Sequence, residues 1–190
     1  DGYALWRVRA DWGEASPRSE GLGKEGVAAD LDAYLGLWRF LTSIDLTRLA
    51  RVGLGSAEEP LLHLVPEPRR LRATLADGLF VRIVDLPAAL AARRYAVPVD
   101  LVLEVTDALR PGNAGRWHLV GDRDRAACRA TTAPADLSCD ITDLGAAYLG
   151  GTSLGALAAA GRVRARRPAA LAVASAAFGW QPAPAGLEVF

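Results

Sequence analysis

Between residues 136 and 163, hydrophobic and polar positions follow first a period of two and then a helical period. Leu137, Cys139 and Ile141 alternate with polar neighbours, which is the pattern of a half-buried strand. Two short helical patterns follow, and glycines end each of them, because glycine adopts the left-handed conformation at helix ends at little steric cost. The stretch predicts one strand and two short helices, which are marginal alone and need a sheet to pack on.

The same pattern along the rest of the chain predicts further strands and helices. Strands are expected at residues 3–9, 27–31, 44–52, 72–75, 79–84, 99–105, 115–120, 126–132 and 163–166, and helices at 31–41, 87–95 and 168–178. Residues 11–26 are polar and predict a loop, and Asp77-Gly78 between two apolar runs predicts a hairpin turn. Strands and short helices in this order indicate an α+β fold.

A segment rich in Gly, Pro and Glu ends near residue 68 and predicts a domain boundary there. The predicted units are residues 1–68 and 69–190. With 51% hydrophobic residues among 190, the chain can bury one substantial core or two modest ones.

Charge and composition narrow the classes of function. The 22 basic and 22 acidic residues give a net charge of zero, which argues against a broad nucleic-acid footprint. Since no apolar run approaches the roughly 20 residues of a membrane span and the charged N-terminus is no signal peptide, we expect no membrane partner and a cytoplasmic location. The chain contains no methionine and is rich in Ala, Arg, Leu and Gly, so we expect a piece of a longer bacterial protein.

The two cysteines, Cys128 and Cys139, fall on opposite arms of a predicted hairpin around residues 133–135. Such a hairpin would bring the two side chains close together. Two interpretations stay open, a disulfide and two buried free thiols. The two distant histidines, His63 and His118, match no zinc-binding spacing with these cysteines.

The glycine motif at residues 18–23 reads Arg-x-x-Gly-x-Gly, a pattern that cradles a pyrophosphate where it lies between a strand and a helix N-terminus. Here the preceding residues are polar, and the candidate strand follows the glycines. We therefore interpret residues 18–23 as an ordinary loop. Asp140 and Asp143 flank a predicted helix start and are interpreted as caps, since carboxylates accept hydrogen bonds from free N–H groups there.

Three longer segments resemble the Eis (enhanced intracellular survival) family of GNAT N-acetyltransferases: DAYLGLWRFLTSIDL, TDALRPGNAGRW and APADLSCDITDLGAAYLGGTSLGALAAAGRV. The family acetylates amines, including aminoglycosides, from acetyl-CoA. The resemblance implies that residues 1–68 are the C-terminal part of a degenerate central GNAT fold and residues 69–190 a sterol carrier protein-like domain. It also implies a homo-oligomer, a hexamer in the family.

The resemblance further implies that the N-terminal GNAT domain, which binds acetyl-CoA, is missing from this chain and is its partner within the same protein. The chain alone is then expected to be inactive. The family uses a C-terminal aromatic residue whose carboxylate is the general base, and this chain ends in Phe190. Glu188 and Asp77 are candidate contacts for a cationic substrate, although Asp77 is first of all a turn residue.

Two other functions remain open at this point. Sterol carrier folds can hold an apolar tunnel, so the second unit is an alternative lipid-binding module. Apolar helices more often fill a core than line a cavity. The third alternative is a purely structural or oligomerisation domain.

Overall fold

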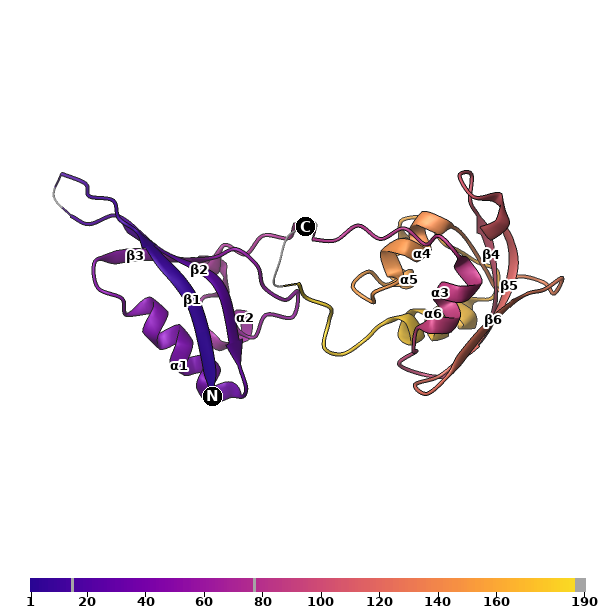
Figure 1. Cartoon of the computed structure of the whole chain (residues 1–190), viewed down its shortest axis with the longest axis horizontal. Coiled ribbons are helices and arrows are strands. Elements are labelled where there is room, and N and C mark those ends of the chain that lie inside the picture. Colours follow the sequence, from indigo (N-terminus) through magenta and orange to yellow (C-terminus); the bar gives the residue numbers. More distant parts are fainter. Residues whose placement is uncertain (15, 77, 187–190) are drawn as a thin grey trace. The chain divides into compact units, whose positions relative to one another are not determined.

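The computed structural model describes residues 1–14, 16–76 and 78–186. The chain forms two compact units. The first comprises Asp1–Pro66 together with Ala185 and Gly186, and the second comprises Glu67–Pro184 (Figure 1). This division lies beside the boundary predicted at residue 68.

The first unit is a three-stranded sheet with two helices: β1 (Gly2–Arg9), β2 (Ser19–Ala28), α1 (Leu31–Thr42), β3 (Thr47–Val52) and α2 (Leu61–Leu64). The strand order is β1-β2-β3. β2 runs antiparallel to β1 and parallel to β3, so β2, α1 and β3 form a βαβ unit.

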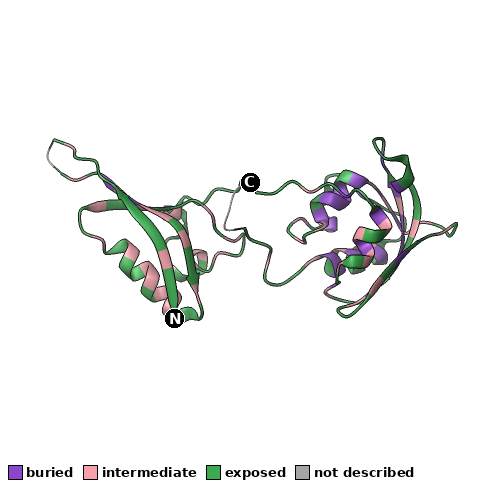
Figure 2. Ribbon diagram, in the orientation of Figure 1, coloured by how far each residue is buried: buried purple, intermediate pink, exposed green. Residues whose placement is uncertain are grey.

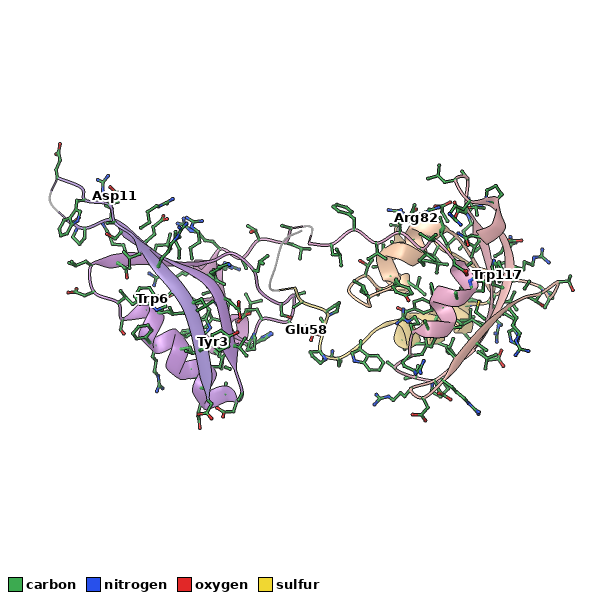
Figure 3. The ribbon with its side chains drawn as sticks, viewed as in Figure 1. Tyr3, Trp6, Asp11, Glu58, Arg82 and Trp117 are labelled. Atoms are coloured by element: carbon green, nitrogen blue, oxygen red, sulfur yellow. The ribbon has the colours of Figure 1, made fainter. Side chains whose placement is uncertain are left out.

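The helix α1 covers one face of this sheet without being buried itself. Figure 3 labels Trp6 on β1, whose ring packs edge-on against Phe40 of α1 at 5.5 Å between ring centroids. No residue of α1 is buried, and Ser19 and Gly21 are the buried residues in the described part of this unit (Figure 2). The first unit therefore has little core of its own.

The predicted loop at residues 11–26 is wrong over its second half, because β2 begins at Ser19. The polar residues of β2 are compatible with a strand because Glu20 and Glu25 bind side chains of the neighbouring strands. Glu20 forms ion pairs with Arg9 on β1 and with Arg51 on β3. Charge pairing across an exposed strand hides the alternation that a half-buried strand shows.

The second unit is a five-stranded sheet covered on one face by helices. Its elements are the 3-10 turn Pro68–Leu71, α3 (Leu86–Ala92), β4 (Val99–Thr106), the 3-10 turn Pro111–Asn113, β5 (Gly115–Gly121), β6 (Ala126–Ala130), β7 (Leu137–Asp140), α4 (Ile141–Ala147), α5 (Leu154–Ala159), β8 (Arg164–Ala165) and α6 (Pro168–Phe178). The strand order is β6-β5-β4-β7-β8, with β4 and β7 parallel and the other pairs antiparallel.

The core of the second unit lies between the helices and one face of β4 (Figure 2). Alternate β4 side chains, from Val99 to Val105, are at most 3% exposed. They belong to one cluster with fully buried leucines of α3, α4 and α5 and with Phe178 of α6. Alanines at positions 170, 174 and 177 let α6 approach closely.

The strand and two helices predicted from residues 136–163 are confirmed as β7, α4 and α5, and the predicted helix 168–178 matches α6. The predicted α+β fold is likewise confirmed. Neither half of the hairpin predicted around Asp77-Gly78 is a strand among residues 72–76 and 78–84. Phe80 lies outside any strand and is 85% exposed. Three residues later, the side chain of Ile83 is buried in the core of the second unit.

The predicted hairpin of the cysteines is also wrong, because β5 and β4 lie between β6 and β7. Cys128 on β6 and Cys139 on β7 are therefore three strand spacings apart, about 14 Å. A disulfide needs Cα atoms within about 7 Å. Both cysteines are buried free thiols.

None of the helices in the described ranges is long and apolar enough to cross a bilayer.

Candidate functional site

The three residues predicted to act on substrate, Asp77, Glu188 and Phe190, lie outside the described residues. Their roles stay predictions. Ala185 and Gly186, the last described residues before Glu188 and Phe190, group with the first unit.

The glycine motif at residues 18–23 forms no phosphate-binding loop. Gly21 and Gly23 lie inside β2, in register with Val8 and Trp6 of β1. The helix after this strand is α1, whose N-cap Asp30 accepts a hydrogen bond from Ala33 N at 2.8 Å. Because the Asp30 carboxylate occupies the N-terminus of α1, this end of the helix is closed to an anion.

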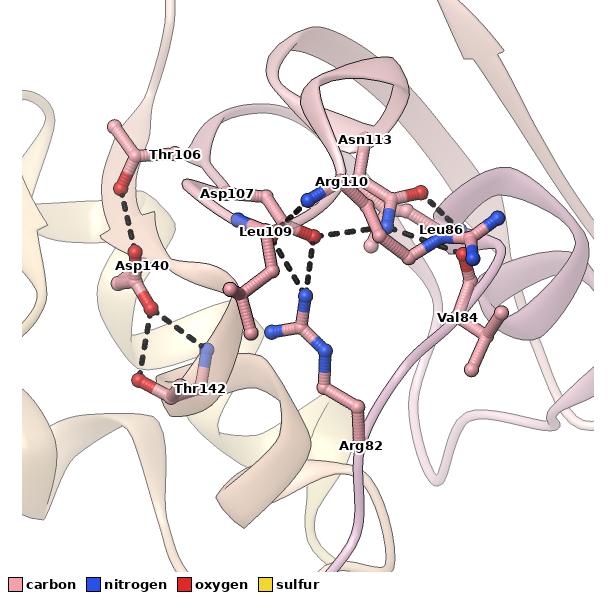
Figure 4. Close-up of polar contacts among 10 residues, drawn as sticks. All are labelled: Arg82, Val84, Leu86, Thr106, Asp107, Leu109, Arg110, Asn113, Asp140 and Thr142. Atoms are coloured by element: carbon pink, nitrogen blue, oxygen red, sulfur yellow. Dashed lines mark hydrogen bonds and ion pairs between the residues drawn. The ribbon is translucent and has the colours of Figure 1, made fainter.

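A buried polar cluster lies at the C-terminal end of β4 (Figure 4). Arg82 donates two hydrogen bonds to Asp107, at 2.6 and 2.8 Å. Asn113 donates to Asp107 at 2.9 Å and to Val84 O at 3.2 Å, and it accepts from Leu86 N at 3.0 Å. Asp107 and Asn113 are 5% and 4% exposed. The cluster fixes the chain entering α3 to the end of β4.

Burial alone would raise the pKa of Asp107. Hydrogen bonds from Asn113, Arg82 and the backbone N–H groups of Arg110 and Leu109 outweigh that effect and hold the pKa well below its usual range. The carboxylate is ionised and its oxygens are all engaged within the protein. The cluster is therefore a structural joint, and a base would need a free carboxylate.

This joint is absent from the predictions made from sequence. Asp107 accepts from the N–H groups of Leu109 and Arg110, at 3.1 and 3.0 Å, the local pattern in which Asp caps a turn. The sequence offers one signal for this turn, an Asp that follows a predicted strand and precedes the turn residues Pro111-Gly112. Its long-range partners, Arg82 and Asn113, have no such signal in the sequence.

The predicted capping role of Asp140 and Asp143 is confirmed. Asp140 is the N-cap of α4, and the two side chains form a reciprocal capping box. Asp140 also accepts from Thr106 of β4 at 2.8 Å, and Asp143 pairs with Arg162 Nε at 2.6 Å. These carboxylates hold helix ends and strand ends together.

The outer face of the second sheet carries paired charges. His118 lies 2.7 Å from Asp100, and Glu104 bridges Arg116 and Arg166 at 3.2 and 3.0 Å. Hydrogen bonds from these two arginines lower the pKa of Glu104. Within the described ranges, no group of His, Cys, Asp and Glu residues could hold a metal ion.

After α6 ends, the chain runs beside the turn that follows α4. Gly150, with φ of 91°, lies against the backbone at Phe178 and Trp180. Gly151 lies against Pro184. Arg93 connects the same two segments, because it donates hydrogen bonds to Phe178 O at 3.0 Å and to Tyr148 O at 2.8 Å.

Two family models match this chain. The model of the acetyltransferase (GNAT) domain matches residues 1–83, and the model of the sterol carrier protein domain matches residues 86–185. The units divide at residue 66 by their contacts and at residues 83–86 by these models, so the boundary at residue 68 stays a prediction.

Curated relatives and solved structures agree with these models. An uncharacterized N-acetyltransferase of Streptomyces avermitilis is 47% identical over 183 residues, 96% of this chain and 45% of the relative. The N-acetyltransferase Eis of Mycobacterium tuberculosis is 39% identical over 184 residues, 94% of this chain and 42% of the relative. The crystal structure of Eis1 from Mycobacterium abscessus has a TM-score of 0.80 at 33% identity, covering 98% of this chain and 48% of that one. The chain thus spans less than half the length of these relatives.

One expectation needs correction. The sequence predicted that the chain lacks the GNAT domain that binds acetyl-CoA and is inactive alone. The match at residues 1–83 conflicts with a missing GNAT domain, so the predicted inactivity is unsupported. That residues 1–68 belong to a degenerate central fold stays a prediction.

Proposed function

Because the chain belongs to the sterol carrier protein domain family over residues 86–185 and has Eis-type N-acetyltransferases as homologues, we propose that it works in an acetyl-CoA-dependent N-acetyltransferase of amines. The substrates are amines of the aminoglycoside type. The observation that carries this proposal is the 39% identity to Eis across 94% of the chain.

The residues proposed to act are Phe190 and Glu188 in the C-terminal tail, together with Asp77. The terminal carboxylate of Phe190 takes a proton from the substrate ammonium, directly or through one water, so that the neutral amine can attack, which requires an approach of about 3 Å. Glu188 and Asp77 add negative charge that favours a cationic substrate. Ala185 and Gly186, the last described residues, group with the first unit by their contacts, which supports a role of the tail in the acetyltransferase part.

The first unit supports a second role, as a wall of the substrate site and an assembly surface. Its helix α1 is apolar on most sides, with Leu31 56% and Phe40 50% exposed. A helix that is hydrophobic all round is normally buried. The proposed partners are a further GNAT domain of the same protein and identical copies in a homo-oligomer.

The lipid-carrier alternative receives less support. Tyr95 and Phe178 pack edge to face at 5.3 Å and are at most 1% exposed, in the centre of the second unit. Large side chains in this position fill the space that a lipid tunnel needs. Native mass spectrometry of the purified protein is expected to find no bound lipid.

The proposed base is tested in the natural full-length protein that contains residues 1–190, after its C-terminal residue has been checked by intact mass. Acetyl transfer from acetyl-CoA to a panel of aminoglycosides is measured, with an alcohol of similar size as the control acceptor. One glycine added after Phe190 moves the carboxylate by up to ~3.6 Å. We expect kcat to fall by about 10²–10⁴-fold, the usual contribution of a general base.

The matched control is Phe190→Leu, which keeps the carboxylate in place. It is expected to retain most of the activity. Full activity and an unchanged pH profile in the extended enzyme would show that Phe190 is not the base. Absence of acetyl transfer to any amine would overturn the proposed function itself.

A further inference from the structure

We propose that Gly150, Gly151 and Arg123 form a seat that fixes the path of residues 179–184 and so positions the end of the chain. This inference rests on the proposed function of Phe190. In that reaction the three residues are positioning residues, since they touch the tail and not the reacting atoms.

The first contact of the seat is at Gly150. A Cβ atom there would lie 3.0 Å from Phe178 O and 3.4 Å from Trp180 N. The tail backbone therefore passes so close to residue 150 that a Cβ atom there would push it away by a few tenths of an ångström. The glycine that ends α4 serves a second purpose, which the sequence pattern alone does not show.

The second contact is at Gly151. A Cβ atom there would lie 3.3 Å from Cγ of Pro184, closer than an ordinary van der Waals contact. The backbone of Gly151 has no positive φ, in contrast to Gly150. A side chain at residue 151 is thus free of backbone strain, and its main effect falls on the tail.

The third contact holds the ring of Trp180. The guanidinium of Arg123 lies 5.9 Å from the ring centroid, within the range of a cation–π contact. Arg123 is itself fixed by a hydrogen bond from Nε to Ala96 O at 3.0 Å. Ala96 N in turn donates to Ala177 O of α6 at 3.0 Å. Arg123 therefore ties the first tail residue after Gly179 to the base of the helix.

The seat limits where the end of the chain can reach. Six residues follow Pro184, and a fully extended chain spans at most about 3.6 Å per residue. The carboxylate of Phe190 is thereby restricted to within about 22 Å of the seat. A tail released at Gly179 has five more residues of freedom and a correspondingly larger volume to search.

The experiment uses the natural full-length protein with Gly151→Val, and Gly112→Val as the matched control. Gly112 is exposed in the same unit, and a Cβ atom added there would meet no other atom within 4 Å. Hydrogen exchange of peptides covering residues 179–186 measures seating directly. Steady-state kinetics and the pH profile of kcat measure its consequence.

We expect Gly151→Val to speed exchange in the tail and to lower kcat by on the order of 10- to 100-fold, the cost of a misplacement of about 1 Å. The KM for acetyl-CoA should stay unchanged, and the acidic limb of the kcat profile should weaken because the base is displaced. Trp180→Ala should act in the same direction, and Trp180→Tyr should restore most of the activity. Gly112→Val should change neither exchange nor kcat.

The outcomes separate this inference from the proposed function. If tail exchange is unchanged in Gly151→Val, the seat does not exist, whatever the activity. If Gly151→Val keeps kcat while the glycine extension after Phe190 lowers it, the positioning role is wrong and the proposed base stands. If neither change affects kcat, both are overturned.

Discussion

The side chain of Asn113 donates a hydrogen bond to Asp107 at 2.9 Å, and its own oxygen accepts the N–H of Leu86 at 3.0 Å. One amide thus connects the end of β4 to the start of α3. Buried polar groups of this kind contribute little while paired and cost much when one partner is removed. Removal of either Asn113 or Asp107 should therefore destabilise the second unit.

Replacing Asn113 by Ala is expected to lower the free energy of unfolding by about 1–3 kcal/mol, because the Leu86 N–H loses its partner inside the protein. Urea unfolding followed by circular dichroism measures the change. Asp124→Ala is the control, since its side chain is exposed. Equal stabilities of the Asn113 and Asp124 variants would contradict the role of the joint.

The pH dependence of stability should reflect Asp107. Its pKa in the folded protein lies below the ordinary value of 3.8, so ionised Asp107 contributes stability that is present above pH 3.8 and is lost as the pH falls through the folded value. Asp107→Asn should therefore be less stable than the wild type at pH 7. The difference should shrink below pH 3.8.

Urea midpoints of the wild type and Asp107→Asn at several pH values test this. Asp136 and Asp140 also have lowered pKa values, from a hydrogen bond with Arg167 and from the Thr142 N–H respectively. Because the wild type and Asp107→Asn both keep Asp136 and Asp140, these two carboxyl groups contribute the same loss of stability in acid to each protein. A difference that is constant from pH 7 to acid would show that Asp107 does not titrate as predicted.

The two thiols should react slowly in the folded protein and never with each other. Burial raises the pKa of Cys128 to about 11 and that of Cys139 to about 12, so little thiolate is present near neutral pH. Alkylation followed by mass spectrometry should label both only after denaturation. Thr132→Cys supplies an exposed thiol as the positive control. A peptide that links Cys128 to Cys139 would refute the strand order.

The second unit was the more predictable of the two from sequence. Its strands alternate because one face packs on a core and the other meets water, and α6 is an apolar run that begins at Pro168 and is followed by Gly179. The unit's strand order was not predictable, since β6 and β7 are neighbours in sequence but separated by β5 and β4. Which strands pair depends on long-range packing, which local patterns do not record.

The first unit and the site were less predictable for physical reasons. The buried positions of β2 are Ser19 and Gly21, and its Glu20 is paired across the sheet, so β2 shows no apolar period. Asp107 and Asn113 resemble ordinary loop residues until their partner Arg82 is brought close by the fold. The close approach of the tail to Gly151 likewise depends on tertiary structure, while the sequence indicates only a helix end.

The last prediction concerns the glycines of β2. If residues 18–23 cradled a pyrophosphate, Arg18 would make a charge-assisted hydrogen bond worth about 1.5–3 kcal/mol, and its loss would raise the KM for acetyl-CoA about tenfold or more. In the structure Arg18 is exposed and Gly21 lies within the sheet, where a Cβ atom would be 3.8 Å from Leu49 O. Arg18→Ala and Gly21→Ala should therefore leave the KM for acetyl-CoA unchanged in the full-length enzyme. Gly23→Ala serves as the contrast: its Cβ would lie 3.1 Å from Val52, so it should lower stability, again without a change in KM. A large rise in KM with Arg18→Ala, at unchanged stability, would restore the motif as the cofactor site.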